Sequence, residues 1–477
     1  MLSRRTTAAL SAAATAWVVA LSPSARAQPE GKDGAARPEA SSSSAEAKAT
    51  RPASGRGASL ARCLQLAERH HPDLLAARAR LRHVRAQLLE AYSAPFFNFR
   101  ATGGASLAPT VRGNNVYSPN TDQSLTSSLG MAWRVTVNGV LPLWTFGKIT
   151  NLWDAAEANV KVKEAEVDVT RDAIRMDVRR AYFGLQVARD GLDLLDDAQS
   201  KLDEAVQDMT KKVDQDEGDP IKLLKLRTFA AEFVARRAEA ERFEQIALAG
   251  LRFYTGDDRL DIPDEPIREA AHQLLPLARY RAAAKAYRPD VRMAKAGVEA
   301  REAQVRQHRS NMFPSLGLAL SAGLAAAPEV ANQINPFVSD PGNYFHYGVA
   351  LVFEWKLDVV PQVARIQQAQ AQLDEVLALE EKATSGVAAE VAEAYAEAAD
   401  WRKRLTAYRK ASKLSKQWLS TVQQAIDVGT MDDDEIMDPA KSYAEHRYNV
   451  LRAIMEYNVA LSKLSKVTGW DAIAPER

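Results

Sequence analysis

Two long stretches without proline constrain what this chain can fold into. One lies between Pro142 and Pro220, the other lies between Pro361 and Pro439, and the two have the same length. Because a proline inside a helix costs about 3 kcal/mol, its exclusion from tracts of this length indicates continuous helix. At about 1.5 Å per residue, each helix would span roughly 100 Å. No compact domain needs helices of this reach. In the first tract, apolar residues from Val178 to Val213 also recur at the alternating spacings of a coiled-coil seam.

The chain repeats one plan twice. His71-Pro72-Asp73 corresponds to Arg288-Pro289-Asp290, and Gly218 corresponds to Gly429. A repeated order of elements at a nearly constant separation is the signature of internal duplication. We therefore predict a domain plan with these parts: 1–27, signal peptide; 28–57, disordered leader; 58–256, first repeat (helix, strand pair, long helix, helix); 257–277, connecting segment; 278–469, second repeat of the same plan; and 470–477, C-terminal tail.

The N-terminal residues have the features of an export signal. Two arginines are followed by an apolar run at 8–21, and Ala25-Arg26-Ala27 fits the small-x-small cleavage pattern. We expect cleavage after Ala27 and export across a bacterial inner membrane. Residues 28–57 are rich in Ser, Ala, Pro, Gly and charge, and this composition cannot bury enough apolar surface to order itself.

Short alternating segments precede each long tract. Side chains of a strand point alternately to its two faces, and these segments place apolar residues on one face and small or polar residues on the other. One such hairpin would indicate a soluble sheet with a buried face, but two in an exported chain favour a membrane sheet with aromatic residues near its ends. The predicted lipid-facing residues are Trp133, Val135, Val137, Leu316, Leu318, Leu320, Tyr347, Val349, Leu351 and Phe353.

Four strands cannot close a barrel, and an open sheet edge is not tolerated in lipid. Membrane barrels have about eight strands or more. The protein is therefore either outside a membrane or made of several copies that pool their strands. Three copies would supply twelve strands and would place their long helices in a ring below them.

With these features the chain resembles the TolC family of outer-membrane efflux and secretion channels, from about Leu60 to Gly469. The resemblance rests on the order and spacing of several motifs, which are the paired Pro-Asp starts at Pro72-Asp73 and Pro289-Asp290, the strand-opening Pro95 and Pro314, and the passage from Leu141-Pro142-Leu143-Trp144 to Gly147-Lys148. It implies a mainly α fold with a small membrane β-barrel contribution, built from duplicated long helical hairpins and four strands per protomer. A homotrimer would form a twelve-stranded barrel and an α-helical tunnel.

The resemblance also implies a function and a location. The protein would be a passive export duct in the outer membrane of a Gram-negative bacterium, with a large periplasmic portion. It would serve a tripartite efflux or type I secretion system, whose periplasmic adaptor (membrane fusion) protein and inner-membrane pump of the RND or ABC type would open its tip. The resemblance does not distinguish whether the exported cargo is a drug, a metal or a protein. The alternative is a periplasmic coiled-coil scaffold or adaptor without a membrane barrel.

An acidic gate is a further implication of the resemblance. In TolC-like channels, acidic residues after the glycine of the second repeat ring the closed tip, and Glu435, Asp438 and Asp434 match this place. Glu435 and Asp438 are three residues apart and so would share a helix face, and their ring would favour cations. A solvated turn that caps a helix explains the same residues equally well. The family's aromatic and arginine latch is replaced here by Ile426 and Met431, so we expect a looser or differently built gate.

Two turns are candidates for adaptor docking, and they contain Gly218, Asp219, Gly429 and Thr430. A helical hairpin needs a glycine at such a turn in any case, and both explanations can hold together.

Other classes of function find little support. The chain has no GxSxG, HExxH, GxGxxG or P-loop pattern, so we predict neither an enzyme nor a cofactor. One cysteine and scattered histidines predict no metal site. The 62 basic and 61 acidic residues nearly balance, so nothing indicates a nucleic-acid partner.

Overall fold

The computed structural model describes residues 57–112, 124–328, 340, 342–473 and 475. The predicted signal peptide, and all of the predicted leader except residue 57, lie outside this part of the chain. The elements follow one another in the same order in both halves, apart from two short 3-10 helices in the second. They are α1 (Leu60–His70), α2 (Pro72–Ser93), β1 (Phe99–Arg112), β2 (Ser124–Trp144), α3 (Lys148–Asp214), α4 (Pro220–Thr255), α5 (Leu277–Tyr287), α6 (Pro289–Ser310), β3 (Ser315–Ala326), β4 (Tyr344–Glu354), α7 (Val359–Asp427), η1 (Asp433–Ile436), α8 (Met437–Thr468) and η2 (Asp471–Ile473).

The two long helices are confirmed. α3 has 67 residues and α7 has 69. Pro220 begins α4, and Pro361 and Pro439 lie in the first turns of α7 and α8, where a helix has no partner for the missing N–H. The prolines therefore mark helix starts, and α3 and α7 end several residues before the next proline, at the turns.

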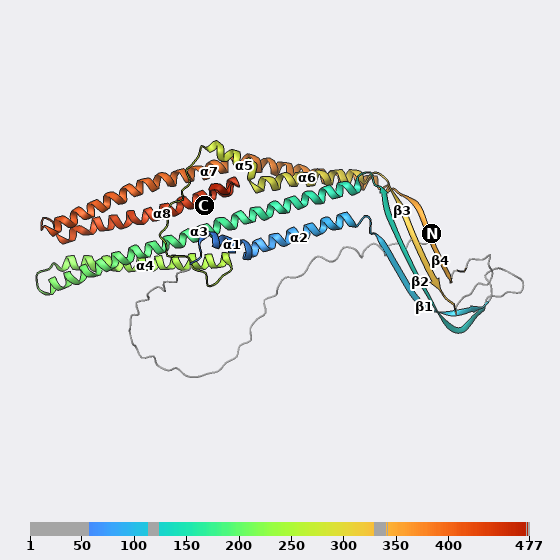
Figure 1. Cartoon of the computed structure of the whole chain (residues 1–477), viewed down its shortest axis with the longest axis horizontal. Coiled ribbons are helices and arrows are strands. Elements are labelled where there is room, and N and C mark those ends of the chain that lie inside the picture. The colour runs from blue at the N-terminus through green and yellow to red at the C-terminus, as the bar shows by residue number, and fades with distance from the viewer. Residues whose placement is uncertain (1–56, 113–123, 329–339, 341, 474, 476–477) are drawn as a thin grey trace, which may run out of the picture. The chain divides into compact units, whose positions relative to one another are not determined.

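Shorter helices lie along the long ones (Figure 1). α2 and α4 pack against α3, α6 packs against both α3 and α7, and α8 packs against α7. Within the described residues, no helix combines the length and the apolar character needed to cross a bilayer. The main core joins the two halves, because Val178 and Leu185 of the predicted seam pack with Leu74 of α2, Leu251 of α4 and Leu451 of α8.

A buried arginine ties the first helical hairpin to the segment that follows it. Arg189 of α3 is 7% exposed, and it donates hydrogen bonds to Glu244 of α4 at 2.9 Å, to Asp261 at 2.5 Å and to the carbonyl of Ile262 at 3.1 Å. Removing one partner of a buried ion pair leaves an uncompensated charge, so these contacts hold one specific arrangement.

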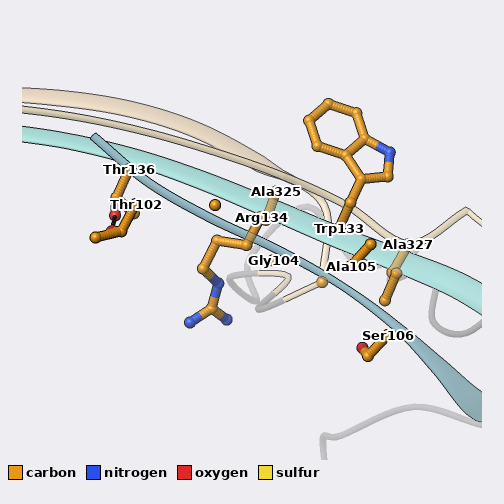
Figure 2. Close-up of a pocket in the computed structure, with 12 residues that line it drawn as sticks. Thr102, Gly104, Ala105, Ser106, Trp133, Arg134, Thr136, Ala325 and Ala327 are labelled. Atoms are coloured by element: carbon orange, nitrogen blue, oxygen red, sulfur yellow. Dashed lines mark hydrogen bonds between the residues drawn. The ribbon is translucent and has the colours of Figure 1, made fainter. Parts of the chain in front are cut away.

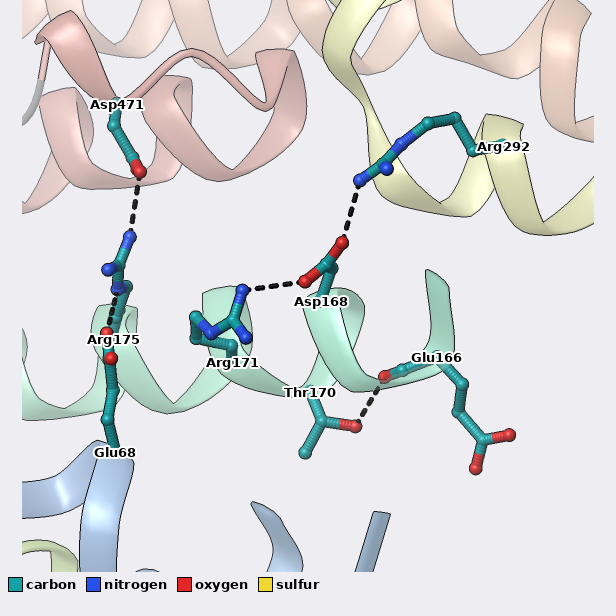
Figure 3. Close-up of polar contacts among 8 residues, drawn as sticks. All are labelled: Glu68, Glu166, Asp168, Thr170, Arg171, Arg175, Arg292 and Asp471. Atoms are coloured by element: carbon teal, nitrogen blue, oxygen red, sulfur yellow. Dashed lines mark hydrogen bonds and ion pairs between the residues drawn. The ribbon is translucent and has the colours of Figure 1, made fainter. Parts of the chain in front are cut away.

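A second polar junction connects the two repeats (Figure 3). Arg175 of α3 donates to Glu68 of α1 at 2.6 Å and to Asp471 of η2 at 2.7 Å. Asp168 of α3 accepts a hydrogen bond from Arg292 of α6 at 2.9 Å. The middle of α3 is thereby linked to elements from both ends of the chain.

Asp172 lies beside this junction, and its raised pKa predicts how the stability of the fold depends on pH. Burial, with a smaller effect of Asp471, raises the pKa of the Asp172 carboxyl from 3.8 to about 6. The folded state holds this proton more tightly than the unfolded chain, so the contribution to stability is full below about pH 4 and is lost as the pH rises through 6. We expect Asp172→Asn to remove this loss and to raise the melting temperature at pH 7.5, by an amount that corresponds to at most ~3 kcal/mol.

Melting curves of the purified protein at pH 4.5 and pH 7.5 would measure this effect. Equal losses of stability between the two pH values in the wild type and in Asp172→Asn would contradict it.

The four strands form one antiparallel sheet in the order β1-β2-β3-β4. The hairpin of the first repeat joins that of the second through β2 and β3, where Val135 pairs with Leu324 and Leu141 with Leu318. Pro142 lies beside a register shift in this ladder, a place where a strand tolerates the missing N–H. β1 and β4 are the two edges of the sheet.

Candidate functional site

The strand register places all of the predicted lipid-facing residues on one face of the sheet. Leu316, Leu318 and Leu320 of β3 lie opposite Phe353, Leu351 and Val349 of β4. Through β2, the same face continues to Val137, Val135 and Trp133. The four predicted residues of the edge strand β4 are 64–78% exposed, those of β2 are 38–41% exposed, and those of β3 are half-buried between their neighbours.

The same face contains further apolar residues beyond the predicted set. They lie on the face of the predicted residues and extend it, since Leu324 pairs with Val135, Phe345 with Leu324, and Leu107 with Met131, and they are exposed. Alternation along β3 and β4 already groups Leu324 and Phe345 with the predicted residues, whereas the glycines and alanines of β1 obscure the pattern around Phe99 and Leu107. These further residues are Phe99, Leu107, Leu129, Met131, Leu324 and Phe345. A single apolar surface therefore runs across strands from both repeats. Its contact with lipid stays a prediction.

The opposite face of the sheet carries mostly small and polar side chains, with a few apolar ones such as Val140. Trp133 and Arg134 are neighbours in β2, and Figure 2 shows them on opposite sides of the sheet. On the side of Arg134, the hydroxyls of Thr102 and Thr136 lie 2.6 Å apart across β1 and β2. A hollow of about 430 Å³ is lined by these residues and by Ser106.

The passage from β2 to α3 is a strained turn held by polar contacts. Phe146 and Gly147 have φ angles of 51° and 85°, so the chain turns through the left-handed region. The Lys148 ammonium donates to the Ser315 hydroxyl of β3 at 2.8 Å, and Asn151 donates to the Ser310 hydroxyl at the end of α6 at 2.8 Å. The start of the long helix is thereby fixed to the sheet and to the other repeat.

In the first tip turn, the glycine does not have the left-handed backbone that is usual for a glycine at the end of a helix. The residue with a left-handed backbone is Asp216, with φ 59°, and not Gly218. Gly218 is needed for a close approach instead, because a Cβ there would lie 2.7 Å from the backbone nitrogen of Val213. Asp219 caps α4, since its carboxylate accepts a hydrogen bond from the Ile221 N–H at 2.8 Å.

The second tip turn is a helix C-cap of the expected kind. Gly429 has φ 76°, and its N–H donates to the carbonyl of Ile426 at 2.8 Å. The N–H and the hydroxyl of Thr430 both donate to the carbonyl of Ala425 at 2.9 Å. Turn geometry therefore accounts for both docking candidates of this tip, and adaptor docking stays a prediction.

The predicted gate residues follow this turn. Glu435 lies in η1 and Asp438 lies in the first turn of α8, and both are exposed. They do not share one α-helix, because the 3-10 helix ends between them at Ile436. Asp434 also belongs to η1, but its side chain lies outside the described part of the structure.

The two tips also touch each other, which the sequence analysis missed. The Lys222 ammonium of α4 lies 3.5 Å from the Asp432 carboxylate that precedes η1. Met437 at the start of α8 packs against the cluster that contains Met209 of α3 and Leu223 of α4. Their sequence separation hid both contacts.

Cys63 and His71, whose side chains could act in catalysis or metal binding, are buried by helix packing. Burial raises the pKa of the Cys63 thiol to about 12, so it is not a nucleophile at neutral pH. His71 is buried and caps α2, because its Nδ1 accepts from the Asp73 N–H at 3.3 Å, whereas His70 is exposed. Among the described residues, no three His, Cys, Asp or Glu side chains gather as a metal site would require.

Comparisons with known proteins give a family and a fold. A model of the family described as outer membrane efflux protein matches residues 63–257 and 281–470. No curated protein sequence matches the chain.

Three solved structures illustrate the fold. The Campylobacter jejuni CmeC outer membrane channel has a TM-score of 0.71 at 16% identity, over 86% of this chain and 85% of that one. The open state of the Neisseria gonorrhoeae MtrE outer membrane channel has a TM-score of 0.69 at 18% identity, over 86% and 88%. The Vibrio cholerae outer membrane protein VceC has a TM-score of 0.68 at 16% identity, over 86% and 96%. At these identities the likeness shows the fold.

Proposed function

Because this chain belongs to the outer membrane efflux protein family, we propose that it is the export duct of a tripartite efflux or type I secretion system. The family is one of outer-membrane channels and not of enzymes. The finer proposal concerns the assembly, the gate and the partners of the channel.

The two-faced sheet with free edges is the observation that carries this proposal. An apolar face, most exposed on β4, runs across all four strands, and within the described residues β1 and β4 each leave one side without a partner strand. In lipid such edges must be paired, and four strands are too few to close. β4 of one copy pairing with β1 of the next would close a twelve-stranded barrel from three copies. The apolar face would then meet outer-membrane lipid, and the polar face would line the passage.

The helices would extend this passage into the periplasm. α3 starts at the sheet and ends at the first tip, so roughly 100 Å of helix separates the barrel from the turn. An adaptor protein would dock on the turns at Gly218-Asp219 and Gly429-Thr430. An inner-membrane pump of the RND or ABC type would supply the energy, since a passive duct performs no chemistry.

The acidic tip gives a direct test of the gate. Three copies would crowd the carboxylates of Glu435 and Asp438 around a narrow mouth, where bound cations would obstruct the passage. We expect the double variant Glu435→Gln/Asp438→Asn to raise single-channel conductance several-fold in a planar bilayer and to weaken cation preference. Asp427→Asn is the matched control, because Asp427 is an exposed acid at the end of α7, before the turn.

Purification from outer-membrane fractions separates the alternatives. A particle that needs detergent and has the mass of a trimer before boiling supports the duct. Conductance that ignores the double variant would keep the duct and discard the gate. A water-soluble monomer would overturn the duct and favour the periplasmic scaffold.

A further inference from the structure

We infer that the polar face of the sheet forms a cationic band that favours anions, and cargo with carboxylate, sulfonate or phosphate groups, in the barrel part of the duct. This inference rests on the proposed trimeric duct and adds a specificity-determining region to it. The charge of the band comes from Arg100 and Arg134, and His346 lies in the row between them.

The register brings these three side chains into adjacent rows of one face. Arg134 lies opposite Gly104, two residues from the row in which Thr102, Thr136 and His346 are aligned. The next row of this face contains Arg100 with Asn138. The basic side chains therefore occupy three consecutive rows, and threonine, asparagine, serine and glycine surround them.

Within the four strands, no carboxylate lies in the three rows of this band. Among the residues of the four strands, the only acidic one is Glu354, at the last position of β4. It lies six residues beyond Gly348, which belongs to the Arg100 row, and this corresponds to about 20 Å of strand. Glu354 also has its own cation, the Lys356 ammonium at 4.0 Å.

Aromatic packing orients the band without cancelling its charge. The Arg134 guanidinium carbon lies 5.9 Å from the centre of the Tyr344 ring, and that ring lies 4.9 Å from the ring of His346. A Cβ at position 323 would lie 2.6 Å from the His346 ring, so this ring lies against Gly323. Within the described part of the chain, neither Arg100 nor Arg134 forms an ion pair, and both side chains are exposed. A guanidinium held beside an aromatic face keeps its full charge.

Barrel geometry makes this charge effective across the whole passage. Twelve strands spaced about 4.8 Å apart and tilted by about 40° close at a backbone radius of roughly 12 Å. An arginine reaching inward from that wall places its charge within one Debye length of the axis, about 8–10 Å at ordinary salt. Three copies of Arg100 and of Arg134 would then raise the potential throughout this part of the lumen. Guanidinium groups also bind carboxylates and phosphates in a bidentate way, which matches the proposed cargo.

Ion selectivity tests the inference. Reversal potentials would be measured across a tenfold KCl gradient in planar bilayers, with Glu435→Gln/Asp438→Asn as the background so that the tip does not dominate. We expect Arg100→Gln/Arg134→Gln to lower the chloride-to-potassium permeability ratio, by roughly sevenfold for each kT of potential lost. The charge-conserving variant Arg100→Lys/Arg134→Lys should retain most of the ratio.

Each outcome is decisive. An unchanged ratio in the glutamine variant, or an equal fall in the lysine variant, would overturn the inference while leaving the duct intact. If the double glutamine variant does not assemble, Arg100→Gln and Arg134→Gln are measured singly, and each should lower the ratio by a smaller factor. Absence of any conductance from the background protein would count against the proposed duct and not against the band.

Discussion

Val349→Arg is expected to prevent assembly in the outer membrane, whereas Ala350→Arg in the next position is expected to leave a functional channel. Both side chains are exposed in the middle of β4, so loss of packing does not distinguish them. They differ in the face to which they point. An arginine on the lipid face near the bilayer midplane costs about 2–4 kcal/mol, and the same residue on the lumen face stays hydrated.

In the proposed trimer, all three protomers would carry this penalty together. Fractionation of membranes followed by electrophoresis of unboiled samples would measure the amount of assembled trimer. Equal amounts of trimer from the two variants would contradict the assignment of the faces. Loss of trimer from Ala350→Arg alone would mean that the faces are reversed.

Gly469→Ala is expected to destabilise the helical part much more than Gly256→Ala, although the two glycines end corresponding helices of the two repeats. Both have left-handed backbones, with φ 64° and φ 69°, so alanine costs about 1–2 kcal/mol at either place. At Gly469, a Cβ would also lie 2.6 Å from the carbonyl oxygen of Tyr287 and 2.9 Å from the Cα of Arg288.

These neighbours are backbone atoms at the junction of α5 and α6, so they cannot rotate away as a side chain can. At Gly256 the nearest atom is the Cβ of His70 at 3.1 Å. We therefore expect Gly469→Ala to cost a further 1–3 kcal/mol, which is typical of overpacking. Thermal unfolding of both variants in one detergent would measure the difference. Similar melting temperatures would show that the α5–α6 junction yields easily.

Local features of this protein could be read from its sequence. The absence of proline located α3 and α7, because the cost of proline in a helix does not depend on what the helix packs against. The alternation in β3 and β4 identified an apolar face, because the period of a strand is a property of its backbone. The turn residue Gly429 was also recognisable, since a glycine that ends a helix acts on its own turn.

The candidate site could be predicted only in part, because it depends on contacts between segments that are distant in the sequence. The alternating residues predicted one face of each strand, but not that β2 pairs with β3 and merges the hairpins of two repeats into one sheet. The opposing face with Arg134 and His346 becomes a band only through this pairing. The contact between Lys222 and Asp432 was hidden by their distance along the chain.

The sequence by itself determined the duplicated plan, the long helices, their turns and the two-faced strands, because propensity, periodicity and capping act within a few residues. The tertiary structure decided the order of the strands, the partners of Arg175 and Arg189, and the left-handed conformation of Asp216 in place of Gly218. These features depend on register and on packing between distant segments. Arg175, for example, bonds to residues 107 and 296 positions away, and no local pattern specifies such pairs.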